Sequence, residues 1–204
     1  NQLTLQRAGL EAAAVSGMYY AEEVLELRRV SEMARRFVAL VIVAARGEGL
    51  DQPRTSALVD KYELRRHLTE DERTFLGEDA PSAARKLSFH WQQEAAMVVG
   101  WAGGWVPELT SPNTLSIGQT AGAIVAQCPD MDDLRDRATR RDLKIVLDRA
   151  DLYYQLSEIL REDFHGEKAL INRFSYPAIY HRHQAFSWLL HWYGRNWDEL
   201  DIPF

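Results

Sequence analysis

The chain has 204 residues, with 24 lysines and arginines against 30 aspartates and glutamates, so its formal net charge is −6 with histidine neutral. Hydrophobic residues make up 46% of the chain and charged residues 26%, which is the composition of a folded globule and excludes a disordered chain. The negative charge disfavours nucleic acid as a partner. The longest apolar run, Phe37–Ala45, has about half of the roughly 20 residues that cross a bilayer, so no membrane partner is expected.

Cys128 is the only cysteine, so the chain forms no internal disulfide and a reducing compartment is expected. The amino end lacks a basic stretch followed by an apolar one, which also favours a cytoplasmic protein. The sequence begins with Asn1 rather than Met, so the removal of an upstream targeting segment stays open.

Helical periodicity dominates the chain, because apolar residues recur at spacings of three and four while Gly and Pro are scarce. Capping and turn residues divide this pattern into segments. The predicted helices are Arg29–Arg46, a segment after Asp51-Gln52-Pro53 that carries Leu58, Leu64 and Leu68, a capping-box helix from Thr69 to Leu76, a long helix from Ser82 to Gly103, Ser116–Gln127, Arg141–His165 and Pro177–Tyr193.

No segment alternates convincingly with period two, so the predicted fold class is all-α. We expect a single-domain globule of about seven to nine helices with no significant sheet. Residues 1–28 are predicted as an N-terminal arm or helix of uncertain packing, and residues 29–204 as one helical domain.

Several charged residues fall on otherwise apolar helix faces. Glu94 shares the spacing of Trp91 and Trp101, and Arg182 lies on the apolar stripe of the last predicted helix. Asp148 and Asp151 form a polar seam along the longest helix, with Tyr154 beside them.

A charged group removed from water costs several kcal/mol unless it is paired. We therefore expect Arg182, together with Arg36, to meet Glu94, Asp148 or Asp151. One interpretation is a structural ion-pair network between helices. The other is a pocket for a small polar ligand, or for acid/base chemistry. In that pocket the cluster would have aromatic walls formed by Trp91, Trp101, Tyr153 and Tyr154.

Several segments are similar to a known family. Leu147–Tyr154, Ile179–Leu190 and Trp197-Asp198, preceded by Arg36–Gly49 and Leu68–Leu109, resemble in order and spacing the hallmark segments of the bacterial domain of unknown function 4272. The resemblance spans about residues 30–201. It implies a helical domain and supplies no activity. His181 departs from the family, which usually has an acidic residue at that position.

Motifs for catalysis are missing from the sequence. There is no Gly-x-Ser-x-Gly elbow, no Gly-x-x-x-x-Gly-Lys phosphate loop and no His-Glu-x-x-His zinc motif, so neither a metal nor a cofactor is predicted. The leading hypothesis is a non-catalytic helical binding or interaction module that meets a basic protein partner, for example as an accessory or immunity-type protein. The alternative is a small-molecule-binding protein, or an undiscovered enzyme, that uses the Glu/Asp/Arg cluster. The sequence leaves the oligomeric state open.

Overall fold

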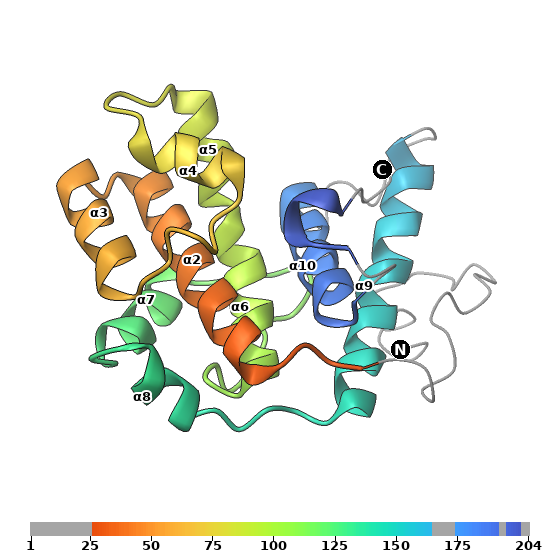
Figure 1. Ribbon diagram of the computed structural model, residues 1–204. Helices are drawn as coiled ribbons and strands as arrows, with labels where there is room; N and C mark the ends of the chain where they lie inside the picture. Colours follow the sequence, from red (N-terminus) through yellow and green to blue (C-terminus); the bar gives the residue numbers. More distant parts are fainter. Residues whose placement is uncertain (1–25, 165–173, 192–194, 201–204) are drawn as a thin grey trace.

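The computed structural model describes residues 26–164, 174–191 and 195–200 (Figure 1). Most of the predicted arm, residues 1–28, lies outside these ranges, as do the predicted helix ends at His165 and Tyr193. The described part of the chain contains no strand, which confirms the prediction of an all-α globule. None of its helices is both long and apolar enough to span a membrane.

Four helices form a row through the molecule: α2 packs against α6, α6 against α10, and α10 against α9 (Figure 1). Shorter helices pack on the other side of α2, and a 3-10 turn, η3, follows α10. The helices are α2 (Val30–Glu48), α3 (Gln52–Lys61), α4 (Glu70–Gly77), α5 (Ala83–His90), α6 (Gln92–Gly103), α7 (Gly118–Ala126), α8 (Met131–Asp136), α9 (Leu143–Phe164), α10 (Tyr176–Leu189) and η3 (Trp197–Glu199).

Helix α2 lies at the centre, and most of its residues from Met33 to Arg46 are buried, including Arg36 and Arg46. Its Phe37 stacks on Trp105, with ring centroids 5.4 Å apart. Where α2 meets α6, a Cβ atom on Gly100 would lie 2.6 Å from the Phe37 ring. The missing side chain therefore allows the two central helices to touch.

The predicted helix from Ser82 to Gly103 is two helices, α5 and α6, which meet at Trp91. The turn lets the end of α5 lie against α2, where a Cβ atom on Gly47 would be only 2.6 Å from the backbone nitrogen of His90. As a result Leu87, four residues before Trp91, is 56% exposed and does not share a face with Glu94. The apolar stripe of α6 therefore does not continue into α5.

Helix α3 ends at Lys61, earlier than predicted. The chain leaves the helix through Glu63, whose φ of 54° is in the left-handed region. Leu64 and Leu68 are still buried, but they lie in the segment 62–69 that crosses α2 on its way to α4 (Figure 1). This change places the residues that follow Leu64 beside α2.

Candidate functional site

Arg182 on α10 and Glu94 on α6 form an ion pair, so of the three acids expected as partners of Arg182 the structure selects Glu94. The Nε and Nη2 atoms of Arg182 lie 2.8 and 2.7 Å from the Oε2 atom of Glu94. Both side chains are fully buried. Ser116 completes the contact, because its backbone N–H donates to the Oε1 atom of Glu94 at 2.8 Å.

The segment 107–117 wraps around the same guanidinium. Nη2 donates to the carbonyl oxygen of Thr114 at 2.8 Å and to the hydroxyl of Thr110 at 2.9 Å. Nη1 donates to the Tyr153 hydroxyl at 2.9 Å. Burial alone would lower the pKa of Arg182, but Tyr153 and Glu94 outweigh it and raise the pKa above the ordinary value, so the group stays charged.

This cluster has the geometry of a structural ion pair. The guanidinium donors point at protein acceptors, and the charged atoms are sealed from water, so a ligand could reach them only by breaking existing bonds. The sequence did not predict these contributions of Ser116 and Thr110: Ser116 was expected to begin a helix, but α7 starts at Gly118, and both residues lie in the loop before it.

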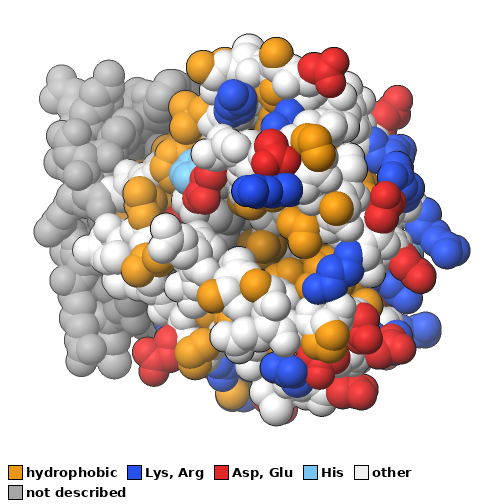
Figure 2. Space-filling view, turned by 90° about the vertical axis from the view of Figure 1, so that its left-hand side faces the viewer, with side chains coloured by type: hydrophobic (Ala, Val, Ile, Leu, Met, Phe, Trp, Pro, Cys, Tyr) orange, Lys and Arg blue, Asp and Glu red, His pale blue; other side chains and the backbone are white. Residues whose placement is uncertain are grey.

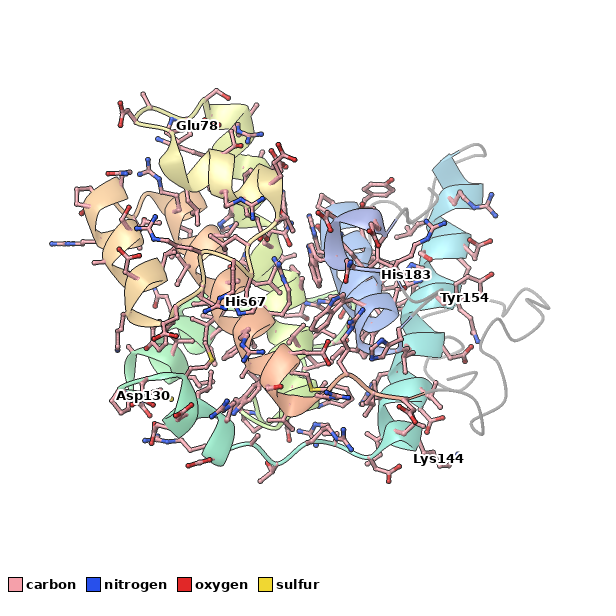
Figure 3. All side chains as sticks on the ribbon, viewed as in Figure 1. His67, Glu78, Asp130, Lys144, Tyr154 and His183 are labelled. Carbon is pink, nitrogen blue, oxygen red and sulfur yellow. The ribbon has the colours of Figure 1, made fainter. Side chains whose placement is uncertain are left out.

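The acids of α9 lie elsewhere, and the expectation that they would join Arg182 is wrong. Asp148 is exposed, and half-buried Asp151 accepts a hydrogen bond from Gln155 at 2.8 Å. The side of α9 that carries Asp148 faces solvent in part, since Ile145 one turn earlier is 48% exposed. Tyr154 is directed toward α10, where its ring contacts His183 edge to face at 5.8 Å (Figure 3).

The two tryptophans predicted as walls have separate surroundings. Trp101 is buried and contacts Phe186 edge to face at 6.1 Å, while the guanidinium of Arg141 covers its ring at 4.7 Å. Trp91 is half-buried at the junction of α5 and α6, next to His90. Trp101 thus belongs to the core around Arg182, and Trp91 does not.

Arg36 forms a different buried pair from the one expected. Its partner is Glu72, the capping-box residue of α4, and the two side chains join through both carboxylate oxygens. Glu72 also accepts the backbone N–H of Thr69 at 2.9 Å, as the capping-box spacing predicted. The guanidinium of Arg36 covers the ring of Trp197 at 4.4 Å. The capping-box motif predicted the hydrogen bond between Glu72 and Thr69, but it did not predict the ion pair between Glu72 and Arg36.

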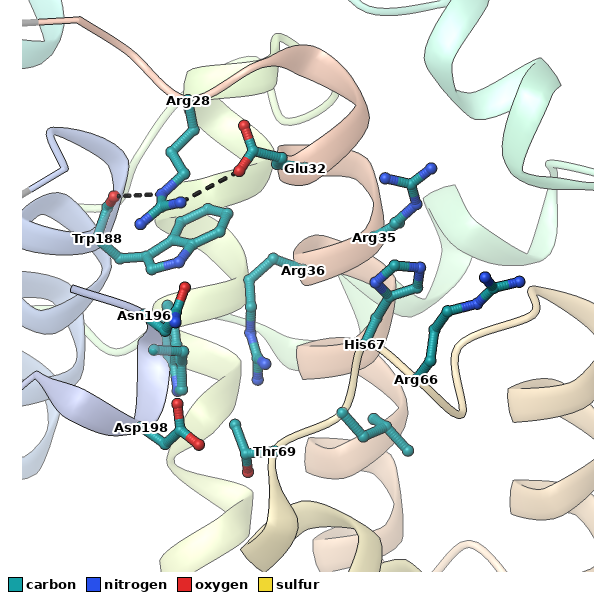
Figure 4. Close-up of a pocket in the computed structure, with 12 residues that line it drawn as sticks. Arg28, Glu32, Arg35, Arg36, Arg66, His67, Thr69, Trp188, Asn196 and Asp198 are labelled. Atoms are coloured by element: carbon teal, nitrogen blue, oxygen red, sulfur yellow. Dashed lines mark hydrogen bonds and ion pairs between the residues drawn. The ribbon is translucent and has the colours of Figure 1, made fainter. Parts of the chain in front are cut away.

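Arg36 also lines a cavity of about 290 Å³ between α2, the segment 62–69, the end of α10 and η3 (Figure 4). It is the one residue of the predicted cluster that lines this cavity. The lining residues are Arg28, Glu32, Arg35, Arg36, Arg66, His67, Leu68, Thr69, Trp188, Asn196, Trp197 and Asp198.

One end of the cavity is cationic. Arg35, Arg66 and His67 lie together there (Figure 4). Within the described residues, no hydrogen bond or ion pair engages the side chain of Arg35 or Arg66. Partial burial, and after it the two guanidinium groups, lower the pKa of His67 below its ordinary value. Arg28, by contrast, is neutralised by Glu32 at 3.1 Å.

A second cavity of about 450 Å³ shares Arg35, Arg66 and His67 with the first. Its remaining wall is of mixed charge, since it includes Lys61 and Arg135 together with Glu63, Asp130 and Asp132. The face carrying α3 and α7 is mixed as well, with acidic and basic side chains interspersed around a recess lined by hydrophobic side chains (Figure 2). The two cavities therefore share the cationic residues, and the wall of the first contains two acidic side chains, Glu32 and Asp198, against three in the second.

Metal-binding groups and the single thiol were the other candidates for chemistry. Among the described residues there is no group of three His, Cys, Asp or Glu side chains that could hold a metal ion. The Cys128 thiol is buried and lies 3.4 Å from the carbonyl oxygen of Ile124, and burial raises its pKa, which makes it a poor nucleophile.

Comparison with known proteins identifies a family but no characterised relative. The model of the domain of unknown function 4272 matches residues 1–200, which confirms the resemblance seen in the sequence and extends it to the amino end. No curated protein and no solved structure matches the chain.

Proposed function

Because the chain belongs to the family of the domain of unknown function 4272, whose description names no activity, we propose a function from the geometry: the protein binds an anionic ligand in the cavity between α2, the segment 62–69 and η3. We propose no catalytic step. This develops the small-molecule alternative at a different place from the predicted cluster.

The observation that carries the proposal is the pair of uncompensated guanidinium groups. Arg35 and Arg66 share one end of a cavity with His67, in a chain whose net charge is −6. Like charges that share a cavity wall repel one another, and a bound anion removes that cost. Guanidinium groups also match the geometry of carboxylate and phosphate oxygens.

A bacterial, cytoplasmic setting is part of the proposal and rests on the resemblance and on the single Cys128. The basic protein partner also stays a proposal, supported by the net charge of −6. On the face shown in Figure 2, acidic and basic side chains are interspersed, so this face presents no single acidic patch to such a partner.

Titration of the full chain with sulfate, inorganic phosphate and acetate tests the anion site. Isothermal calorimetry at low ionic strength avoids screening of the charges. We expect saturable binding of the two polyvalent anions, weakened at least tenfold in Arg35→Ala and Arg66→Ala. Thermal melting checks that both variants remain folded.

The matched control is Arg149→Ala, which removes one positive charge from the exposed face of α9. We expect it to bind the anions as the wild type does. An equal loss of affinity in the control, or no saturable binding by the wild type, would contradict the proposed function.

A further inference from the structure

The two ends of the cavity are chemically unlike. Arg35, Arg66 and His67 stand at one end, while Trp188, Asn196 and Asp198 stand at the other (Figure 4). Arg36 lies between the ends, but Glu72 already neutralises its charge. The positive potential is therefore confined to the end formed by Arg35, Arg66 and His67. The opposite end would contact a different chemical group of a ligand.

Asp198 sets the chemistry of the opposite end. Its exposed carboxylate lines the cavity and has no hydrogen-bond or ion-pair partner among the described residues. An ionised carboxylate only accepts hydrogen bonds, so the part of a ligand that reaches it must supply donors. It also repels a second anionic group, which disfavours a long polyanion.

The neighbouring residues suit an organic body rather than an ion. Trp188 is buried and contributes only the small exposed part of its indole, which also contacts Arg28 at 4.8 Å and the ring of Trp197 at 5.8 Å. Asn196 anchors η3 through its backbone N–H, which donates to Glu199 at 2.9 Å, and its carboxamide side chain lines the cavity. An amide can both donate and accept, as a polyhydroxylated ligand requires.

Building on the proposed function, we infer that the ligand is a phosphate monoester of a hydroxyl-bearing compound. The phosphoryl group lies at Arg35, Arg66 and His67, where cationic groups match its charge and its oxygen geometry. The hydroxyl groups donate to Asp198, and the body lies against Trp188. A cavity of about 290 Å³ is at the small end of the range for ligand sites, which fits a sugar phosphate or a nucleoside monophosphate.

The experiment compares four probes on the full chain by calorimetry: inorganic phosphate, ribose 5-phosphate, adenosine monophosphate and ribose. We expect ribose 5-phosphate to bind at least tenfold more tightly than inorganic phosphate, and ribose alone to show no binding. Tighter binding of adenosine monophosphate identifies a nucleotide site, and equal binding a sugar-phosphate site. Both results support the inference.

The variant that isolates the inference is Asp198→Ala. It should remove the tenfold advantage of ribose 5-phosphate and leave the affinity for inorganic phosphate unchanged or higher. Asp148→Ala, which removes an exposed carboxylate from α9, is the control and should change neither.

The outcomes separate the two claims. If both organic phosphates bind no better than inorganic phosphate, or if Asp198→Ala keeps the advantage, the inference is wrong while the anion site stands. If inorganic phosphate does not bind at all, the proposed function fails with it.

Discussion

Arg182 and Glu94 are 88 residues apart in the sequence, yet two nitrogens of the one lie within 2.8 Å of a single oxygen of the other, out of contact with solvent. The pair joins α10 to α6 and fixes the segment 107–117 through Thr114 and Ser116. A buried pair of this kind specifies how helices and a loop meet.

Replacing Arg182 by alanine should destabilise the fold strongly, because it leaves the Glu94 carboxylate buried without its cation. We expect a loss of about 3 to 5 kcal/mol in the free energy of unfolding, measured by urea denaturation. Glu94→Ala should cost a similar amount, and the double variant less than the sum. Arg149→Ala on the exposed face of α9 should change stability by less than about 0.5 kcal/mol. If the loss of stability in the double variant equalled the sum of the two single losses, the two side chains would act independently.

His183 should make the fold sensitive to acid. Its side chain is 3% exposed, and burial lowers its pKa from 6.5 to about 4. As the pH falls, the unfolded chain therefore binds a proton at this residue before the folded chain does. The contribution of His183 to the free energy of unfolding is fully present above about pH 6.5 and is lost as the pH drops toward 4. The contribution of this one residue is on the order of 3 kcal/mol. Urea denaturation at a series of pH values should show a shallower fall in His183→Gln; an unchanged slope would argue against the assignment.

The affinity for an anion should depend on pH, because His67 can bind a proton under acidic conditions. Its pKa is lowered by burial and by Arg35 and Arg66, so it is neutral near pH 7. A bound anion favours the protonated ring, and the affinity should therefore rise as the pH falls below about 6.5. Sulfate is the suitable probe because its own charge is constant there. We expect a gain of roughly 3- to 10-fold between pH 8 and pH 5 in calorimetric titrations. His67→Gln, with a neutral amide, should show no such gain.

The contact between α2 and α6 should not tolerate a larger residue at Gly100. An alanine Cβ atom would lie 2.6 Å from the Phe37 ring and 2.8 Å from a methyl group of Val106. Overpacking of this kind costs about 1 to 3 kcal/mol. Gly77→Ala is the natural comparison, because nothing lies within 4 Å of the added atom there, and it should be neutral or gain about 0.4 to 1 kcal/mol. Thermal melting of the two variants separates the cases.

Helical periodicity predicted the fold class and placed Arg182 and Glu94 on apolar helix faces, but it left Glu94, Asp148 and Asp151 open as partners of Arg182. The same argument failed for Asp148, whose apolar neighbour Ile145 is itself 48% exposed. Periodicity shows which residues lie on the same side of one helix. It does not show which of these sides another helix covers.

The cavity could not be predicted in this way. Arg35 lies on α2, Arg66 in the segment after α3, and Asp198 near the carboxyl end, so only the tertiary fold brings them together. The early end of α3 at Lys61 decides where Arg66 lies, and that end depends on the left-handed conformation of Glu63. Local sequence carries little information about such a turn.

Arg36 links three distant parts of the chain, since it belongs to α2, binds Glu72 of α4 and covers Trp197 of η3. A ligand in the adjoining cavity would contact α2, the segment 62–69 that leads into α4, and η3, so its binding energy opposes any local opening that separates them. Backbone amides of η3 should then exchange their hydrogens more slowly when the cavity is filled, and the carboxyl-terminal end should report occupancy of a site formed largely by residues from the first third of the chain.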